Sequence, residues 1–275
     1  MKYLEYIFMA LTAISMAGAC EKHQILFDTD GIAGNAEFKI SCFVPVAVNA
    51  DNQIDSVYVN GVFYAGISAG TNLAVNGTLP AGPGRFFTAP AGGVNVKLFR
   101  KDRIAYDKDM VLKAGKQNIF IYDLEKDPFI VEEAFPYTNT SGIPAGSETF
   151  DTDSVASVRF LNLVWEKGEP FVGKVQYQWR DNTDEKDEDG NYFWHDLGEP
   201  VGFGEVTERC LIIIHKSIFN SAGYARINYR TVNAESGKQM STDYWNGYIG
   251  RVYTHVYRHN LDGSPKAAFT QINDK

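Results

Sequence analysis

The sequence has little basic charge and little cysteine. Lys and Arg number 26 against 34 Asp and Glu, so the formal net charge is −8. Surfaces that bind nucleic acid neutralise phosphates with clustered Lys and Arg, and this balance therefore predicts no nucleic-acid partner. Three cysteines in 275 residues exclude a small fold held together by many disulfides.

Helical patterns are missing as well. No window shows the sustained apolar spacing of an amphipathic helix. The chain instead holds 15 Tyr, 18 Phe, 4 Trp and 25 Gly, and aromatic residues are enriched in strands. Short apolar runs recur at near-regular spacing with turn residues between them, which predicts an all-β chain of antiparallel sandwiches.

The apolar run at the N-terminus is too short to span a bilayer. The chain begins with MKYLEYIFMALTAISMAGAC, in which Lys2 precedes about 14 apolar residues from Tyr6 to Ala19, against the roughly 20 that a bilayer requires. This pattern is typical of a secretory signal peptide. The small residues before Cys20 resemble the lipobox of bacterial lipoproteins, which implies removal of residues 1–19, lipidation of Cys20 and an outer-membrane location. The alternative is an ordinary secreted protein with Cys20 as a free thiol.

Two further cysteines lie in separate halves of the chain. Cys42 and Cys210 each fall within an apolar run. Two buried, reduced thiols are favoured, because free cysteine is among the most buried residue types. A disulfide between them is the alternative in an oxidising compartment.

Composition divides the rest of the chain into four segments. Residues 20–37 are polar and contain glycine, which predicts a tether. Strand-like runs fill 38–135 and resume over 155–275, and each of these segments predicts one β-sandwich domain. Between them, residues 136–154 lose apolar periodicity and are rich in Gly, Pro, Ser and Thr, as expected of a linker.

The two halves share landmarks in the same order. ISCFVPVAVN (40–49) opens the first half as VRFLNLVW (158–165) opens the second, and AGKQNIFIYD (114–123) comes late as IGRVYTHVYR (249–258) does. This order predicts a tandem repeat. Together with DSVYVNG and LPAG, these segments resemble a family of domains of unknown function in cell-surface lipoproteins of Bacteroidetes. The resemblance implies two tandem immunoglobulin-like antiparallel β-sandwich domains and supplies no catalytic residues.

No catalytic set emerges from the sequence. GISAG (66–70) matches G-x-S-x-G, but the Gly- and Pro-rich residues after it cannot form the helix that a nucleophile elbow needs. His255 and His259 lie four apart in a predicted strand and so share a face. No further ligand lies near them at zinc spacing. We therefore expect a protein that is not an enzyme and that requires no cofactor.

The segment DNTDEKDEDGNYFWHD (181–196) is the densest in acidic residues. A twelve-residue calcium loop that starts at Glu185 would place Asp187, Asp189 and Asp196 at ligand positions 3, 5 and 12. The flanking helices of such loops are missing, however. A solvated hairpin that turns at Asp189 and Gly190 is the favoured interpretation, with Ca²⁺ as the alternative.

All four tryptophans lie in the second half. Trp165 and Trp179 fall in predicted strands and are assigned to the core. Exposed aromatic rings in turn-rich segments can stack on sugars while neighbouring polar groups bind hydroxyls, although burial in the core is the commoner fate of such rings. The candidate ligand-binding residues are Tyr192, Trp194, Trp245 and Tyr248.

These patterns together predict a non-catalytic lipoprotein of the outer membrane or cell surface, attached to the membrane through a lipid on Cys20. We expect it to bind a glycan or a partner protein of an uptake or adhesion assembly. A structural subunit of a fimbria-like or stalk assembly is the alternative.

Overall fold

The computed structural model of the chain describes residues 34–47, 49–66, 77–82, 84–133, 153–180, 186–215, 218–248, 251–260 and 268–273. All of them belong to the second of two compact units, Gly34–Lys275. The predicted signal peptide, Cys20, the beginning of the predicted tether and most of the predicted linker lie outside the described residues.

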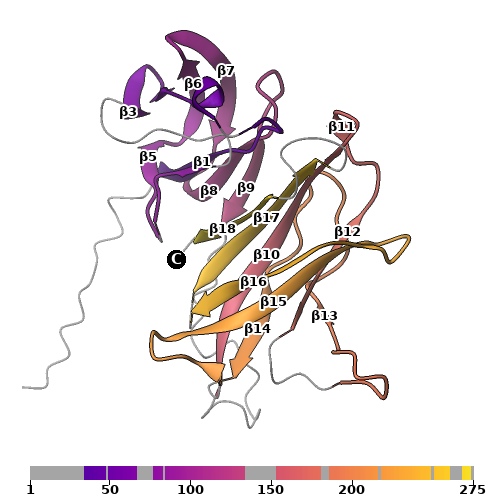
Figure 1. Cartoon of the computed structure of the whole chain (residues 1–275). Helices are drawn as coiled ribbons and strands as arrows, with labels where there is room; N and C mark the ends of the chain where they lie inside the picture. Colours follow the sequence, from indigo (N-terminus) through magenta and orange to yellow (C-terminus); the bar gives the residue numbers. More distant parts are fainter. Residues whose placement is uncertain are drawn as a thin grey trace, which may run out of the picture. The chain divides into compact units, whose positions relative to one another are not determined.

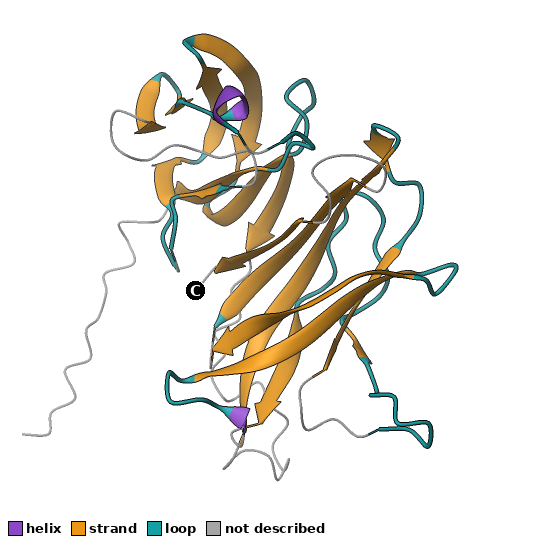
Figure 2. Ribbon diagram, viewed as in Figure 1, coloured by secondary structure: helices purple, strands orange, loops and turns teal. Residues whose placement is uncertain are grey.

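Strands make up most of the described chain (Figure 2). None of its helices has the length and apolar character needed to cross a bilayer. The first half contains the short 3₁₀ helix η3 (Ala50–Asn52) and the strands β1 (Asn35–Cys42), β2 (Ser56–Val59), β3 (Val62–Gly66), β4 (Thr78–Leu79), β5 (Phe87–Pro90), β6 (Gly92–Arg100), β7 (Arg103–Leu112), β8 (Gly115–Ile121) and β9 (Phe129–Glu133).

The second half is built in the same way. Its strands are β10 (Asp153–Glu166), β11 (Glu169–Pro170), β12 (Val175–Arg180), β13 (His195–Asp196), β14 (Cys210–His215), β15 (Tyr224–Asn233), β16 (Gln239–Tyr248), β17 (Val252–Asn260) and β18 (Ala268–Asn273). β1 begins within the predicted tether, and β10 begins within the predicted linker.

Each half folds into two sheets with matching strand order (Figure 1). In one sheet of each half, the first strand pairs with the penultimate strand and the penultimate strand pairs with the last, as β1-β8-β9 and as β10-β17-β18. The other sheets run β3-β2-β6-β7 and β13-β12-β15-β16. The chain is therefore all-β, with four sheets in two groups, as expected of tandem β-sandwiches.

Two strand pairs differ from the predicted antiparallel arrangement. β1 pairs with β8 in parallel, and β10 pairs with β17 in parallel. Parallel neighbours cannot be joined by a tight turn and need a long connection. In the first half, β2 to β7 provide this connection and include the whole of the facing sheet; β11 to β16 do the same in the second half.

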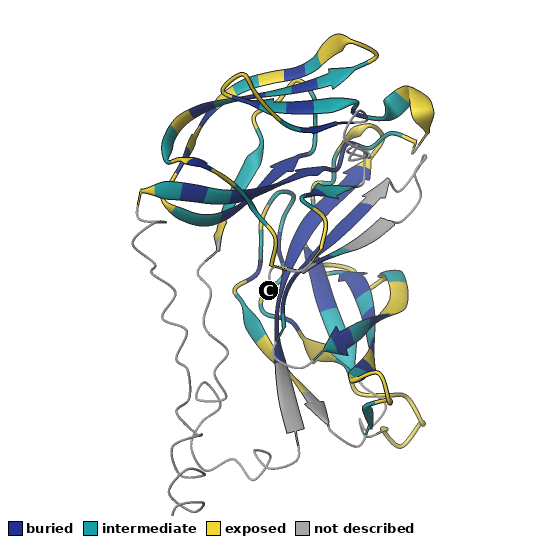
Figure 3. Cartoon of the chain, turned by 90° about the vertical axis from the view of Figure 1, so that its left-hand side faces the viewer, coloured by how far each residue is buried: buried dark blue, intermediate teal, exposed yellow. Residues whose placement is uncertain are grey.

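Side-chain alternation builds a core in each half (Figure 3). On β6, Val94, Val96 and Leu98 are buried and alternate with more exposed residues, because successive side chains point to opposite faces of a sheet. Further members of the two cores are Phe38, Ile40, Val57, Tyr106 and Ile119 in the first half and Val158, Phe160, Tyr177, Ile227 and Trp245 in the second.

A third hydrophobic cluster contains residues of both halves. Phe43 and Phe120 of the first half belong to it together with Leu161, Leu163 and Val256 of the second. These residues explain why β8, β10 and β17 have long uninterrupted buried stretches, since strands buried on both faces carry continuous apolar runs. The two sandwiches therefore share buried surface.

Two buried arginines form hydrogen bonds between the halves. Nη1 of Arg258 donates to the carbonyl of Val44 at 2.8 Å, and Nη1 of Arg159 donates to the carbonyl of Glu132 at 3.3 Å. Nε of Arg159 also donates to Oγ1 of Thr254 at 3.1 Å. Burial lowers the pKa of Arg258 below its usual value. Arginine can be buried in this way because its charge is delocalised and weakly hydrated, and because its five N–H donors can bind several acceptors.

Candidate functional site

The candidate site lies on the outer face of the sheet β13-β12-β15-β16. Ile227 and Tyr229 of β15 are buried in the second core. Arg226, Asn228 and Arg230 alternate with them along the strand, so they project from the opposite face. The centre of this outer face thus carries two guanidiniums with an amide between them.

Neighbouring strands extend this face in register. Arg180 of β12 lies opposite Asn228, which in turn lies opposite Tyr244 of β16. Tyr244, Asn246 and Tyr248 follow one another at every second position of β16, so Tyr248 lies on the same face of the sheet as Tyr244. We name this surface the arginine face; it comprises Gln178, Arg180, Tyr192, Trp194, Arg226, Asn228, Arg230, Tyr244, Tyr248 and Arg251.

Trp194 lies between two cations of this face. The guanidinium carbon of Arg230 is 4.5 Å from the Trp194 ring centroid, and that of Arg180 is 5.2 Å from it. Arg180 also lies 3.7 Å from the ring centroid of Tyr192, which the Nζ of Lys186 approaches to 4.4 Å. Cations over aromatic faces are attracted by the ring quadrupole. The segment that carries Tyr192 and Trp194 is therefore held against the sheet by its arginines.

The other end of the face repeats this stacking. The guanidinium carbon of Arg226 is 3.5 Å from the ring centroid of Tyr244, and that of Arg251 is 4.4 Å from the ring centroid of Tyr248. Tyr244 is 45% exposed. The guanidinium carbon of each arginine of the face thus lies within 4.5 Å of a ring centroid, and the N–H donors that do not face a ring are the groups that a ligand can contact.

Arg230 is linked to a carboxylate through an amide. Its Nε donates to Oε1 of Gln178 at 2.6 Å, and Nε2 of Gln178 donates to Oδ1 of Asp196 at 2.7 Å. Partial burial lowers the pKa of Arg230, and Asp196 acts in the opposite direction. Arginine stays protonated in proteins, so this network orients a permanent cation.

Trp245 is not part of this face. It is 3% exposed and lies in the second core, where its ring is 4.7 Å from the ring of His255 and 5.2 Å from that of Tyr253. The prediction that Trp245 lines a binding face is therefore wrong. Trp245 is next to the outward-facing Tyr244 on β16, and successive side chains of a strand point to opposite faces, so Trp245 points into the sandwich.

The predicted calcium ligands are dispersed. Both oxygens of Asp187 accept hydrogen bonds from Asn191, at 2.7 and 3.3 Å, within a turn in which Gly190 adopts a φ of 80°. Asp196 accepts from Gln178 on the sheet, as described above, and Asp189 is exposed. Glu185 lies outside the described residues. Among the residues that are described, no three Cys, His, Asp or Glu side chains lie close enough to hold a metal ion. The observed turn is that of the hairpin interpretation.

The two cysteines of the described chain are free. Cys42 is buried and Cys210 is half-buried. Burial raises the pKa of the Cys42 thiol to about 12. Most of the G-x-S-x-G segment (66–70) and the side chain of His259 lie outside the description.

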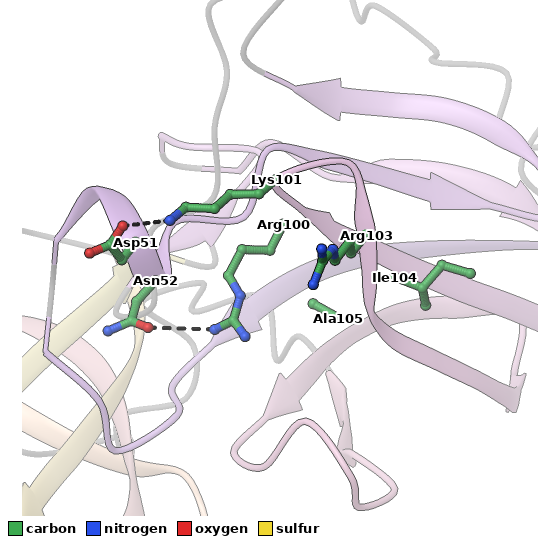
Figure 4. A pocket seen from close by; sticks show the side chains of 7 residues that line it. All are labelled: Asp51, Asn52, Arg100, Lys101, Arg103, Ile104 and Ala105. Atoms are coloured by element: carbon green, nitrogen blue, oxygen red, sulfur yellow. Dashed lines mark hydrogen bonds and ion pairs between the residues drawn. The ribbon is translucent and has the colours of Figure 1, made fainter.

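Two hollows elsewhere on the molecule contain none of the predicted site residues. One, of about 570 Å³, is formed around the β6–β7 turn (Figure 4) and is lined by Asp51, Asn52, Arg100, Lys101, Arg103, Ile104 and Ala105. There Lys101 pairs with Asp51 at 2.6 Å, and Arg100 donates to Asn52 at 3.5 Å. The other, of about 610 Å³, lies between residues 128–132 and 204–206.

The sequence analysis missed the arginines and Tyr244. The signal was present in YARINYR (224–230), where arginine and apolar residues alternate, and in STDYWNGY (241–248). Period-two alternation separates the two faces of a strand. It does not show that the polar residues of two strands distant in sequence share one face, which follows only from the pairing of β12, β15 and β16.

Comparison with known proteins finds no matching family model and no matching curated protein. Among the solved structures that match the chain, the resemblance is distant. A leucine-rich repeat protein from Bacteroides thetaiotaomicron has 9% identity and a TM-score of 0.18; the match covers 82% of this chain and 26% of that protein. The CBMbc module (family CBM26) of Eubacterium rectale Amy13K, solved with maltoheptaose, has 10% identity and a TM-score of 0.21, covering 86% of this chain and 97% of that one. At these TM-scores neither likeness carries an argument.

Proposed function

We propose that the protein is a non-catalytic binding module that holds a glycan on the arginine face of its second sandwich. The observation that carries this proposal is the row of cation–π contacts that Arg180, Arg226, Arg230 and Arg251 make with Trp194, Tyr244 and Tyr248 on one face of the sheet. Carbohydrates are recognised by aromatic surfaces together with fixed polar groups that bind hydroxyls. Asn228 and Gln178 supply amides on neighbouring strands, and the sheet holds them in register with Arg230 and Tyr244.

A rigid face suits this role better than a mobile loop would. Ordered strands pay less conformational entropy on binding, because their side chains are already fixed by packing and hydrogen bonds. Trp194 and Tyr244 are restrained in this way by Arg230 and Arg226. Their partly exposed rings offer apolar area without requiring reorganisation.

A glycan array probed with the detergent-solubilised chain tests this function. We expect binding to at least one glycan class, and we expect Trp194→Ala and Tyr244→Ala each to weaken it about ten-fold or more, a loss typical of a stacking contact. The matched control is Phe63→Ala: Phe63 is 41% exposed on β3, in the first sandwich, and its loss should leave binding unchanged. An array without binding, or equal losses for Phe63→Ala and Trp194→Ala, would contradict the proposal.

The location is part of the same proposal. A lipid on Cys20 would hold the sandwiches, which we propose are immunoglobulin-like, at the outer membrane or cell surface. Several acyl chains together give stable anchoring, at roughly 0.8 kcal/mol per buried CH₂ group. The test is labelling with radioactive palmitate in the native host: Cys20→Ser should abolish the label, whereas Cys42→Ser and Cys210→Ser should retain it. A wild-type chain without label would overturn the anchor and leave the binding proposal standing.

A further inference from the structure

We propose that the glycan held on the arginine face is acidic and carries carboxylate or sulfate groups. This inference rests on the proposed function and specifies its ligand. Two features of the second sandwich lead to it: the arrangement of Arg226 and Arg230, and the contrast between their sheet and the matching sheet of the first sandwich.

Arg226 and Arg230 are presented as a pair on one strand. They lie four residues apart on β15 and on the same face, which separates them by about 13 Å at roughly 3.3 Å per residue. Within the described part of the chain, neither of them forms an ion pair; the nearest compensation for Arg230 is Asp196, reached through Gln178. A chain of sugars with repeated negative groups can therefore contact both guanidiniums at once.

The first sandwich carries the same kind of face in a neutralised form. Lys97 of β6 lies opposite Asp107 of β7, with 3.0 Å between Nζ and Oδ2. Asn95 lies opposite Asp109, and its Nδ2 donates to Oδ1 of Asp107 at 2.8 Å and to Oδ1 of Asp109 at 2.9 Å. In the first repeat, the cation of the outer face is thus satisfied by carboxylates of the neighbouring strand.

The second sandwich replaces those carboxylates by neutral residues. β15 and β16 correspond to β6 and β7 in strand order, and here Arg230 lies opposite Thr242 and Arg226 lies opposite Asn246. Asn228 lies opposite Tyr244. The positive charge of this face is retained while the opposing charge of the neighbouring strand is absent, so the ligand can supply the anion.

Guanidinium geometry favours carboxylate and sulfate as that anion. The planar fork of arginine donates two parallel hydrogen bonds to such oxygens, and these charge-assisted bonds are stronger than bonds to hydroxyls. Contact with the rings of Trp194 and Tyr244 restrains Arg230 and Arg226 before the ligand arrives. A neutral sugar would gain from the rings and amides but would bring no anion to Arg226, and none to Arg230 beyond the compensation that Asp196 gives through Gln178.

The experiment uses two matched pairs of polysaccharides and the detergent-solubilised chain. Polygalacturonate and its carboxyl-reduced form differ in carboxylates; dextran sulfate and dextran differ in sulfates. Affinity electrophoresis in gels containing each polymer measures retardation. We expect at least one acidic polymer to retard the chain. Its neutral partner should bind at least about ten-fold more weakly. The two pairs show whether carboxylate or sulfate is the preferred group.

Variants test the role of the arginines. Arg226→Gln with Arg230→Gln should weaken binding to the acidic polymer at least about ten-fold per arginine. Thr242→Asp, which places a carboxylate opposite Arg230 as Asp107 lies opposite Lys97, should weaken it similarly while both arginines remain. Lys97→Gln, on the matching face of the first sandwich, is the control and should change nothing. Circular dichroism and thermal melting confirm that each variant is folded.

The outcomes separate this inference from the proposed function. In one outcome, neutral and acidic polymers bind with equal affinity, and this binding is lost in Trp194→Ala but kept in the double arginine variant. That result would overturn the proposal of an acidic ligand and support glycan binding. Failure to bind any glycan would overturn both. Single-stranded DNA is the remaining polyanion: if it binds the arginine face as tightly as the polysaccharide does, charge alone is recognised and the inference is wrong.

Discussion

Inside the second sandwich, the hydroxyl of Tyr177 on β12 lies 3.0 Å from Nδ1 of His255 on β17. His255 is fully buried among aromatic rings. Burial lowers its pKa from the usual 6.5 to about 3 and raises that of Tyr177 above its usual value. A neutral imidazole and a neutral phenol therefore meet in the core, where a charged form of either would be poorly solvated.

This pair predicts acid sensitivity. Between pH 6.5 and about 3 the unfolded chain protonates its histidine while the folded chain does not. The contribution of His255 to the free energy of unfolding is fully present above pH 6.5 and falls by up to about 1.4 kcal/mol per pH unit as the pH drops through this window. Urea denaturation at pH 7, 5 and 4 measures it. In His255→Gln the slope should be smaller, and carboxylates common to both proteins cancel in the comparison; identical slopes would refute the assignment.

Arg258 should contribute to the stability of the whole described unit. In Arg258→Met the carbonyl of Val44 loses its donor inside a buried contact, and an unsatisfied buried acceptor costs about 1–3 kcal/mol. Arg103→Met, at an exposed position, should cost less than about 0.5 kcal/mol. Urea midpoints at pH 7 compare the two variants, and equal midpoints would show that the hydrogen bond between the halves is unimportant.

Gly204 is predicted to tolerate no side chain. A Cβ there would lie 2.2 Å from Cζ of Phe129, and its φ of +77° is unfavourable for other residues. Gly204→Ala should therefore cost more than Gly237→Ala, where φ is +67° and nothing lies within 4 Å of the added carbon. Both substitutions carry the cost of a positive φ. The difference between their free energies of unfolding, about 1–3 kcal/mol from overpacking, therefore reports the contact with Phe129. Thermal melting of the two variants measures it.

Tryptophans on opposite faces of the same sheet should behave differently. Trp245→Ala removes a buried ring and should lower the free energy of unfolding by about 3–5 kcal/mol. Trp194→Ala removes a half-buried ring and should cost clearly less while weakening glycan binding. Urea unfolding and affinity electrophoresis on both variants distinguish them. A Trp194→Ala protein as destabilised as Trp245→Ala would place Trp194 in the core.

The cysteines should differ in reactivity. The thiolate is the reactive form, and at pH 8 a thiol with a pKa of about 12 is almost entirely protonated as well as inaccessible. In Cys20→Ser, iodoacetamide should modify Cys210, which is half-buried, before Cys42. Mass spectrometry of peptides after timed alkylation gives the order, with fully denatured protein as the control in which both react. Faster labelling of Cys42 would contradict its burial.

The strand content and the division into two groups of sheets with matching strand order could be predicted because they depend on local signals. Alternating segments such as VNVKLFR, and landmarks repeated in the same order, required no knowledge of partners. The parallel pairing of β1 with β8 could not be predicted, since period-two alternation is the same in parallel and antiparallel strands. The cluster around Phe43 and Leu161 was hidden for a related reason: a run buried on both faces shows its burial but not what covers it.

The site was predicted only in part, and Trp194 and Trp245 show why. Both lie in turn-rich sequence beside tyrosine, asparagine or aspartate. Their fates differ because Trp245 alternates with Tyr244 on a regular strand, whereas Trp194 precedes β13 and lies over two arginines. Strand pairing decides which side chains point into the core. Both tryptophans owe their position to β15: it pairs with the strand of Trp245, and its Arg230 contacts Trp194, from which it is distant in sequence.

The parallel pairs also bear on how the protein matures. Because β10 pairs with β17 over residues 157–165, this stretch of β10 lacks its parallel neighbour until residues 252–260 have been made. The first repeat reaches the same stage once β8 has been made. A chain that is synthesised in sequence order can therefore complete its first lobe early, while the apolar run of β10 must wait for β17 to be made.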